Sequence, residues 1–286
     1  MEKLLIKGGN QLSGKITCSG AKNAALPMIA STILSDEKVT LKNLPYLQDI
    51  TTMFELLGSM GSDILLDEDM NFTIQSNNLK DIEARYELVK TMRASILVLG
   101  PLLAKYGKAR IALPGGCAIG SRPVNYHLDS LRQMGAEIVL KNGYIEASAK
   151  NLKGADIRFD GVTVTGTENL MMAATLAEGK TTLLNVAKEP EIADLADMLN
   201  SMGAKIGGAG SDKITIQGVE KLSGTSFEIP ADRIEAGTYL AAAAVTKGDI
   251  KIEGINPNRL MKVIDKLINT GAKVDYDEDS ISFSMS

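Results

Sequence analysis

One pattern of hydrophobic and polar positions recurs four times along the chain. Each copy is an amphipathic run that ends at a glycine and leads into a short alternating segment; the glycines are Gly61, Gly135, Gly203 and Gly271. The period of the run predicts a helix with one apolar face. The glycine predicts its C-terminal end, because a residue without a Cβ turns through the left-handed region at no steric cost.

A second kind of helix precedes each amphipathic one. It is apolar nearly all round, which is typical of a helix buried on most sides. A short strand follows it, with the alternation expected of a strand that has one solvated face. The expected helices lie at 24–34, 93–103, 169–177 and 237–245, and the strands at 39–42, 109–113, 181–184 and 250–253.

Together these elements form a repeated unit of buried helix, strand, amphipathic helix, strand, turn and strand. Four units are expected at 21–88, 92–150, 160–220 and 232–286, and the segment 4–10 adds one strand that belongs to none of them. Asn142-Gly143 and the segment 277–280 are expected hairpin turns. A fold with buried helices and outer sheets needs such units to close around one another, so the pattern predicts a mixed α/β protein of repeated units.

Composition narrows the class of protein. The length of 286 residues suits about two domains. A net charge of −4 and an aromatic content of 4% argue against a nucleic-acid-binding surface. Two cysteines and one histidine are too few for a disulfide framework or a four-ligand zinc site. With no long apolar run and no signal-peptide pattern at the start, we expect a soluble, cytoplasmic protein that uses no metal and has no membrane span.

The segment 113–124 is the most unusual stretch for chemistry. Two glycines before Cys117 permit a tight loop whose backbone N–H groups face an anion. Arg122 supplies a fixed positive charge, which suits phosphate or carboxylate and also activates a nearby thiol. The alternative is a glycine-rich surface turn with an incidental cysteine.

Lys22 stands at the expected start of the first buried helix. A cation is unfavourable beside the positive end of a helix dipole unless an anion binds there, so the position indicates a ligand site. Arg93 and Arg233 occupy similar places in the second and fourth units, whereas Glu168 and Asn169 break the series in the third. The alternative is a lysine that extends into solvent.

Other candidates favour structural roles. Cys18 is expected to be a small core residue, and the lone His127 a hydrogen-bonded core or surface residue. The segment 189–191, with Glu189, suits the start of a helix. The glycine-rich segment 207–213 lacks the spacing of a phosphate-binding loop and is expected to be a turn between strands.

Five segments together resemble one enzyme family, the UDP-N-acetylglucosamine enolpyruvyl transferases. They are 19–25, 92–95, 113–124, 167–179 and 230–238. The resemblance extends over the whole chain and implies an α/β (α+β) inside-out barrel of repeated units, with helices inside and sheets outside. It implies a complete first domain of three repeats at 21–230. It also implies part of a second domain, made of 1–20 plus 231–286.

The resemblance further implies transfer of the enolpyruvyl group of phosphoenolpyruvate to the 3′-hydroxyl of UDP-N-acetylglucosamine, with release of phosphate. This is the first committed step of peptidoglycan synthesis, and no cofactor is implied. Cys117 resembles the loop cysteine that adds to phosphoenolpyruvate and is alkylated by fosfomycin. The implied catalytic residues are Cys117, Lys22 and Arg122. The implied substrate-binding residues are Lys22, Asn23, Arg93, Arg122, Pro123, Val124, Asn125, Thr163, Val164, Glu189, Asp232 and Arg233.

The chain also departs from the family pattern. Asn125 stands where many members have aspartate against the uracil, and Gly161 where some have lysine. The family continues with two more repeats, so we expect an incomplete second domain that exposes an apolar face, and a chain without turnover. The alternatives are a non-catalytic UDP-sugar-binding protein and the sister enzyme of the shikimate pathway. The sister enzyme is disfavoured because a Lys-Ser pair is expected there in place of Lys22-Asn23.

Overall fold

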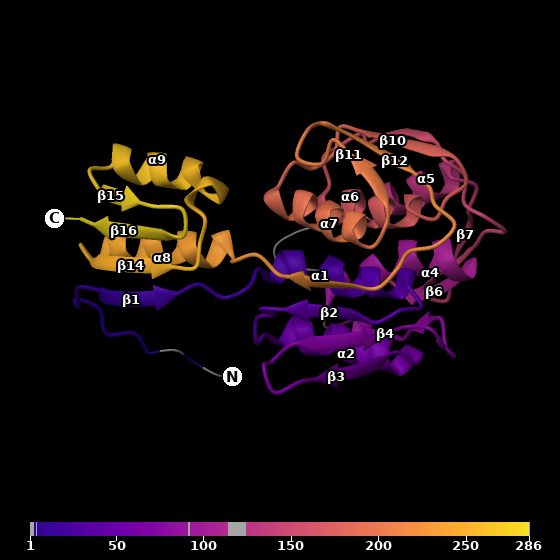
Figure 1. Cartoon of the computed structure of the whole chain (residues 1–286), viewed down its shortest axis with the longest axis horizontal. Helices are drawn as coiled ribbons and strands as arrows, with labels where there is room; N and C mark the ends of the chain where they lie inside the picture. The colour runs from indigo at the N-terminus through magenta and orange to yellow at the C-terminus, as the bar shows by residue number, and fades with distance from the viewer. Residues whose placement is uncertain (1–2, 4, 91, 114–123, 286) are drawn as a thin grey trace. The chain divides into compact units, whose positions relative to one another are not determined.

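The computed structural model describes residues 3, 5–90, 92–113 and 124–285. Its contacts divide the chain into two compact units. Unit 1 comprises Met1–Ala21 and Pro230–Ser286, and unit 2 comprises Lys22–Ile229 (Figure 1). Both ends of the chain therefore belong to unit 1, and unit 2 is one continuous segment.

Unit 2 contains three copies of one motif, each with a four-stranded sheet. The first copy consists of α1 (Lys22–Ser31), η1 (Thr32–Leu34), β2 (Val39–Lys42), α2 (Gln48–Met60), β3 (Asp63–Leu66) and β4 (Phe72–Gln75). The second consists of β5 (Glu83–Ala84), α3 (Tyr86–Val89), η2 (Arg93–Val98), α4 (Leu99–Tyr106), β6 (Lys108–Ala112), α5 (Asn125–Gln133), β7 (Glu137–Lys141) and β8 (Tyr144–Ser148). The third consists of β9 (Asp156–Arg158), α6 (Val164–Ala174), β10 (Lys180–Leu184), α7 (Pro190–Ser201), β11 (Lys205–Gly207) and β12 (Lys213–Gln217).

Strand β13 (Thr225–Glu228) joins the third copy to the first. It pairs in parallel with β2, from Thr225 opposite Val39 to Glu228 opposite Lys42. In the other two sheets the same edge position is held by β5 and β9, which precede the inner helix of their own copy. The last strand of unit 2 thus completes the first sheet, and the three copies close into a ring. Figure 1 shows the β10-β12-β11 and β2-β4-β3 sheets on opposite sides, with α1, α6 and α7 between them.

The inner helices α1 and α6 are buried as the sequence predicts. In α1 every residue from Ala24 to Ser31 is buried, and in α6 every residue from Gly166 to Ala174. Neither helix has a polar face toward solvent along these residues, and burial of their apolar surface stabilises unit 2 by about 25 cal/mol per Å². The outer helices α2 and α7 bury one face only, in agreement with their amphipathic pattern.

The second inner helix differs from the prediction of one continuous helix over 93–103. The structure has the 3-10 helix η2 followed by α4. The Asn169 side chain of α6 accepts a hydrogen bond from Gly100 N at 2.6 Å and donates one to Ile96 O at 2.9 Å. These two groups are the pair that an α-helical bond would join, so the inserted amide interrupts the α-helix at this point.

The predicted helix ends and turns are confirmed. Gly61, Gly135, Gly203 and Gly271 have φ of 108°, 92°, 100° and 101°. Asn142 and Gly143, both with positive φ, connect β7 to β8 as a two-residue hairpin. The glycine-rich segment 208–212 connects β11 to β12, so it is a turn between strands as expected.

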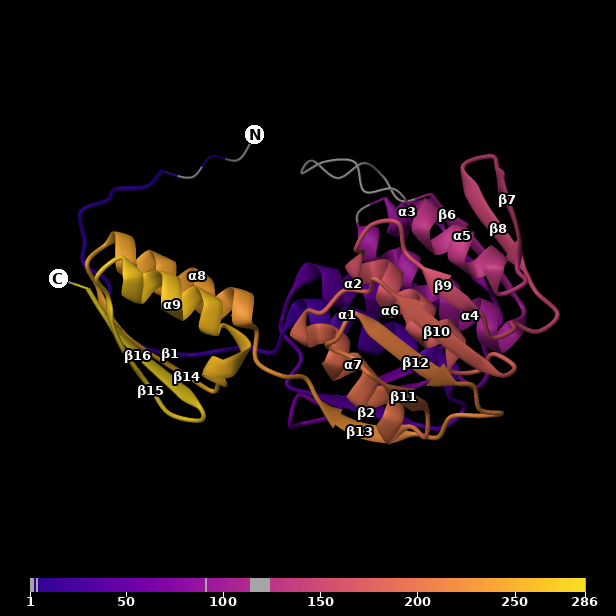
Figure 2. The ribbon, with the colours of Figure 1, turned by 90° about the horizontal axis from the view of Figure 1, so that it is seen from above.

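Unit 1 is a single sheet with two helices on one face. It contains β1 (Ser13–Thr17), α8 (Arg233–Val245), β14 (Asp249–Glu253), η3 (Pro257–Arg259), α9 (Met261–Asn269), β15 (Lys273–Tyr276) and β16 (Ser280–Ser284). The strand order is β1-β14-β16-β15, and Figure 2 shows α8 and α9 side by side on this sheet. Leu240, Ile252, Ile264, Ile281 and Phe283 form the centre of the core.

Two expectations for this unit need correction. The N-terminal strand lies at Ser13–Thr17 rather than at 4–10, where Gly8 and Gly9 interrupt the pattern and Leu5 is fully exposed. Helix α8 is not buried all round: the sheet and α9 cover one side of it, and within the helix only Ala236, Leu240 and Ala243 are buried. On the same helix the apolar side chains of Ile234, Tyr239 and Val245 are exposed.

Candidate active site

Most of the implied substrate-binding residues lie at the start of a helix. Lys22 and Asn23 begin α1, Arg93 begins η2, Val124 caps α5 before Asn125, Thr163 caps α6 before Val164, and Glu189 caps α7. The first N–H groups of a helix have no partner within the helix and carry the positive end of its dipole. A set of such ends is suited to an anionic ligand such as a diphosphate.

Lys22 is paired within unit 2. Its Nζ lies 3.2 Å from a carboxylate oxygen of Asp49, in the first turn of α2. Both side chains are 38% exposed, so the ammonium group remains accessible. Asp49 offsets part of the repulsion between the cation and the start of α1, and a half-exposed Lys22 fits both a ligand site and the alternative of a lysine that extends into solvent. Asp49 was missed in the sequence because its contact with Lys22 depends on how α1 and α2 pack.

His127 is a core residue that forms hydrogen bonds with α6. A hydrogen-bonded core residue is one of the two roles expected for it from the sequence. His127 is 2% exposed, its Nδ1 lies 2.9 Å from Asn169 Nδ2, and its Nε2 lies 3.3 Å from Thr165 Oγ1. Burial, together with the smaller effect of the positive charge of Arg93, lowers the pKa of His127 to about 4. The imidazole is therefore neutral at pH 7, and α5, η2 and α6 meet around it.

The first turn of α6 is fixed by hydroxyl groups. Thr163 Oγ1 accepts a hydrogen bond from Gly166 N at 3.2 Å, which caps the helix. Thr167 Oγ1 donates to Thr163 O at 2.7 Å and accepts from Ala187 N at 3.1 Å. The hydrogen bond from Ala187 N connects α6 to the segment that precedes Glu189. It therefore holds the starts of α6 and α7 together.

Buried carboxyl groups lie between α6 and α7. Glu168 is 2% exposed and Glu191 is 3% exposed. Burial, together with the smaller effects of the charges of Glu191 and Glu189, raises the pKa of Glu168 to about 8. Glu168 is thus mostly protonated at pH 7 and adds little negative charge beside these helix ends. The predicted helix start at 189–191 is confirmed, with Pro190 as the first residue of α7.

Two implied residues belong to unit 1. Asp232 caps α8, where its Oδ1 accepts hydrogen bonds from Ile234 N at 2.7 Å and Glu235 N at 3.2 Å, and Arg233 is the first residue of the helix. Cys18 is 6% exposed and donates to Asp232 O at 3.2 Å. Burial and the charge of Glu235 raise the pKa of the Cys18 thiol to about 11, so its expected role as an unreactive core residue is confirmed.

Replacing Asp232 with alanine tests its capping role. We expect Asp232→Ala to lower the free energy of unfolding by about 1 kcal/mol, since two N–H groups of α8 lose their acceptor. Asp232→Asn keeps an acceptor oxygen and is expected to retain most of the stability. Urea denaturation of the three proteins measures the difference, and equal stability of the alanine variant and the wild type would contradict a capping role.

Three implied residues, Cys117, Arg122 and Pro123, lie outside the described residues. Gly161, where the chain departs from the family pattern, lies within them and is approached by the Tyr126 side chain. A Cβ at Gly161 would lie 2.8 Å from the Tyr126 hydroxyl oxygen. The Tyr126 side chain therefore fills the space that a larger residue at 161 would need, one position after Asn125.

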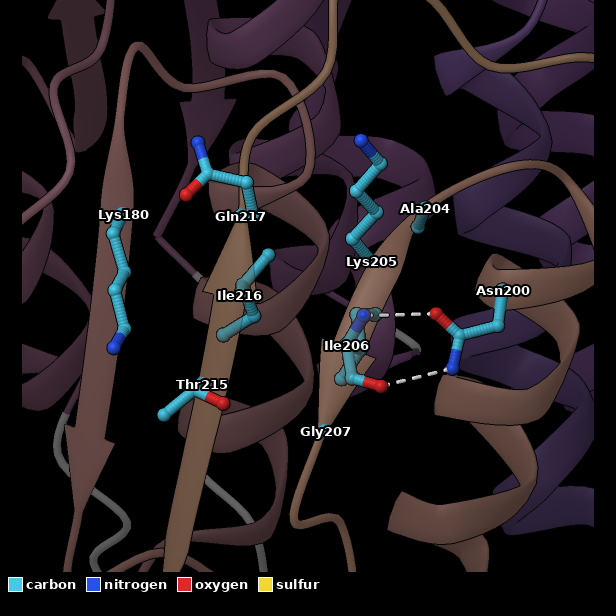
Figure 3. A pocket seen from close by; sticks show the side chains of 9 residues that line it. All are labelled: Lys180, Asn200, Ala204, Lys205, Ile206, Gly207, Thr215, Ile216 and Gln217. Atoms are coloured by element: carbon cyan, nitrogen blue, oxygen red, sulfur yellow. Dashed lines mark hydrogen bonds between the residues drawn. The ribbon is translucent and has the colours of Figure 1, made fainter.

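A hollow in the surface lies elsewhere in unit 2 (Figure 3). It has a volume of about 600 Å³ and lies beside α7, on β10, β12 and β11. Asn200 accepts a hydrogen bond from Ile206 N at 2.9 Å and donates one to Ile206 O at 3.1 Å, so its amide caps the outer edge of β11. None of the implied site residues is among those that line this hollow, and we do not assign the site to it.

The described ranges hold neither a metal-binding cluster nor a membrane span. No group of three or more His, Cys, Asp or Glu side chains is arranged there to hold a metal ion. No helix in this part of the chain combines the length and the apolar character needed to cross a bilayer.

Comparisons with known proteins agree on one family. Residues 6–286 match the family model of EPSP synthase (3-phosphoshikimate 1-carboxyvinyltransferase). The UDP-N-acetylglucosamine 1-carboxyvinyltransferase of Hydrogenovibrio crunogenus is 55% identical over 285 residues, which cover 100% of this chain and 68% of that protein. The enzyme of the same name from Coxiella burnetii is 55% identical over 286 residues, again 100% of this chain, and 66% of that protein is covered.

Solved structures support the fold. The enolpyruvyl transferase NikO from Streptomyces tendae matches with a TM-score of 0.83 and 24% identity, over 96% of this chain and 66% of that one. EPSP synthase from Acinetobacter baumannii matches with a TM-score of 0.75 and 23% identity, over 96% of this chain and 64% of that one. The α/β architecture of repeated units and the family resemblance predicted from the sequence are both confirmed. The chain belongs to the EPSP synthase family of enolpyruvyl (1-carboxyvinyl) transferases.

Proposed function

We propose that the chain transfers the enolpyruvyl group of phosphoenolpyruvate to the 3′-hydroxyl of UDP-N-acetylglucosamine and releases phosphate. This reaction would be the first committed step of peptidoglycan synthesis, in the cytoplasm. The observation that carries the proposal is the 55% identity to UDP-N-acetylglucosamine 1-carboxyvinyltransferases, which extends over 100% of this chain. The chain spans 66–68% of the length of these relatives.

The reaction is an addition followed by an elimination. The 3′-hydroxyl of the sugar gives up its proton as its oxygen forms a bond to C2 of phosphoenolpyruvate, while C3 takes a proton and the C2–C3 double bond becomes single. The C2–O bond to phosphate then breaks, a proton leaves C3, and the double bond forms again. Both substrates are anionic, so helix N-termini and fixed cations lower the barrier by offsetting charge that develops on carboxylate and phosphate.

The residues take their roles from the family motif. Lys22, Arg93 and Arg122 bind phosphoenolpyruvate or the sugar nucleotide, and Asn23 contacts the sugar. Cys117 protonates C3. The remaining substrate-binding positions are Pro123, Val124, Asn125, Thr163, Val164, Glu189, Asp232 and Arg233. The helix starts at Lys22, Arg93, Asn125, Val164 and Pro190 support this assignment, since they present N–H donors suited to the diphosphate. We also propose that unit 2 is the complete first domain, and unit 1 part of the second.

Phosphate release by the purified 286-residue chain decides between this proposal and the opposite expectation of a chain without turnover. With phosphoenolpyruvate and UDP-N-acetylglucosamine present, we expect release that Lys22→Met lowers at least about 100-fold, because a cation that stabilises developing charge is removed. Cys117→Ser is expected to abolish or change turnover. Lys205→Met is the matched control, since Lys205 is an exposed lysine on β11, in the hollow of Figure 3. It should leave the rate unchanged.

Two outcomes would contradict the proposal. UDP-N-acetylglucosamine binding without phosphate release, by a chain shown to be folded, would favour the alternative of a non-catalytic UDP-sugar-binding protein. Release of phosphate with 3-phosphoshikimate in place of the UDP-sugar would assign the substrate of the sister enzyme instead.

A further inference from the structure

The side-chain amide of Asn169 has three partners, all outside its own helix. Its Oδ1 accepts from Gly100 N at 2.6 Å, and its Nδ2 lies 2.9 Å from both Ile96 O and His127 Nδ1. Asn169 is 0% exposed, so no solvent competes for these groups. One buried amide from the third copy of the motif therefore holds two segments of the second copy, η2–α4 and α5.

These partners fix the proton on His127. A backbone N–H donates and a backbone carbonyl accepts, so Gly100 and Ile96 determine which end of the Asn169 amide is oxygen. The Nδ2 end then points its second N–H at His127 Nδ1, which must carry a lone pair. The proton of the neutral ring is consequently on Nε2, which faces Thr165 Oγ1 at 3.3 Å. Asn169 and Thr165, one turn apart on α6, hold the ring from both sides.

Asn169, His127 and Thr165, with their partners Ile96 and Gly100, form one hydrogen-bonded cluster. It lies a few residues after three of the helix starts that are assigned to substrate binding. Arg93 begins η2, three residues before Ile96. Asn125 begins α5, two residues before His127. Val164 begins α6, directly before Thr165. A shift of His127 or Asn169 would therefore move these helix starts relative to one another.

We propose that Asn169 and His127 are positioning residues that hold the starts of η2, α5 and α6 in the arrangement that binds the UDP-sugar. The proposal rests on the proposed function, and it adds two buried residues that do not touch the substrate. The sequence marked Asn169 only as an exception to the series of cations, because its partners lie up to 73 residues away.

The surroundings of His127 keep its imidazole neutral at pH 7. Its pKa is lowered to about 4, first by burial and then by Arg93 on η2. The other charged groups on the elements around it are Glu168 on α6, Asp129 and Arg132 on α5, and Glu137 and Lys141 on β7. Asp129 and Arg132 are paired with each other at 2.8 Å on the exposed face of α5.

His127 is the only histidine in the sequence, so its nuclear magnetic resonance signals need no assignment. In the ligand-free chain, long-range ¹⁵N–¹H correlation spectra are expected to show the Nε2–H tautomer and no titration between about pH 5 and 8. An Nδ1–H tautomer, or titration within that range, would overturn the proposed cluster. This measurement does not depend on the enzymatic function.

A matched pair of variants tests the consequence for binding. Asn in place of His127 keeps an acceptor near the Nδ1 position, so His127→Asn should bind UDP-N-acetylglucosamine within about threefold of the wild type. His127→Gln is closer to histidine in length but leaves the Asn169 N–H without an acceptor, and should bind about tenfold more weakly. Isothermal titration calorimetry measures both, and thermal melting establishes that each variant is folded.

The outcomes separate the positioning role from the proposed function. Wild-type binding together with weaker binding by His127→Gln alone supports the positioning role. Wild-type binding with equal affinity in both variants, or an equal loss in both, overturns the positioning role and leaves the function standing. If the wild type does not bind UDP-N-acetylglucosamine, the proposed function is overturned, and so is the assignment of this UDP-sugar as the ligand.

Discussion

Replacing Gly100 with alanine is expected to lower the free energy of unfolding by about 3 kcal/mol, although alanine is the better helix former. A Cβ at this position would lie well inside contact distance of Asn169 Oδ1 and of the Asn169 carbonyl oxygen, and 3.2 Å from the Cβ of Ala173. The inserted amide cannot move away without losing its bonds to Gly100 N and Ile96 O. Either the clash remains or buried polar groups lose their partners, and both are costly.

Gly58 provides the matched control. It also lies inside a helix, α2, but it is exposed, and the nearest atom to an added Cβ would be Ile64 Cδ1 at 4.0 Å. Gly58→Ala should therefore raise the free energy of unfolding by about 0.5–1 kcal/mol, which is the propensity gain alone. Urea denaturation gives both values, and the same sign for both substitutions would show that the packing around Gly100 is looser than described.

A double-mutant cycle identifies the cause. In an Asn169→Ala background the side-chain amide is absent, so the part of the cost of Gly100→Ala that comes from Asn169 Oδ1 should disappear, whereas the contact with the backbone carbonyl oxygen at position 169 remains. The difference between the two costs is the coupling energy of the pair, expected at about 1–3 kcal/mol. Additive effects would mean that the cost at Gly100 comes from the atoms that this substitution leaves in place, the Asn169 carbonyl oxygen and the Cβ of Ala173.

The parts of this fold that the sequence predicts are those set by nearby residues. The left-handed glycine at Gly61 and the Asn142-Gly143 hairpin follow from conformational preferences of one or two residues. The buried helix α1 follows from its composition. Lys22, Arg93 and Arg233 were found at helix starts for the same reason, since the end of an apolar run is visible in the sequence.

What the sequence does not predict depends on packing between distant segments. The break between η2 and α4 comes from an amide 69 residues beyond Gly100. The strand of unit 1 lies at Ser13–Thr17 because that segment pairs with β14, whereas the more apolar segment before it has no such partner among the described strands. The exposed face of α8 likewise reflects which elements surround it, and an apolar pattern alone predicts burial without supplying the neighbours.

The burial of Glu168 is expected to make the stability of the chain depend on pH. Glu168 lies on an inner helix, 2% exposed, and its pKa is raised from 4.5 to about 8, first by burial and then by the charges of Glu191 and Glu189. The unfolded chain releases this proton near pH 4.5, whereas the folded chain keeps it up to about pH 8. The folded state therefore binds more protons in this range, and the free energy of unfolding falls as the pH rises through it.

Glu168→Gln is expected to remove this loss of stability. Glutamine is neutral in both states, so the variant should be close to the wild type in stability at pH 4.5 and more stable at pH 8, by at most about 4 kcal/mol. Urea denaturation at several pH values gives the difference between the two proteins, in which the other titrating groups cancel. Glu220→Gln, at an exposed position, should change stability by less than about 0.5 kcal/mol at every pH. A difference between Glu168→Gln and wild type that stays constant with pH would mean that the folded chain holds Glu168 ionised. The helix starts around Lys22 and Arg93 would then face a buried negative charge, which would weaken the case for an anionic substrate there.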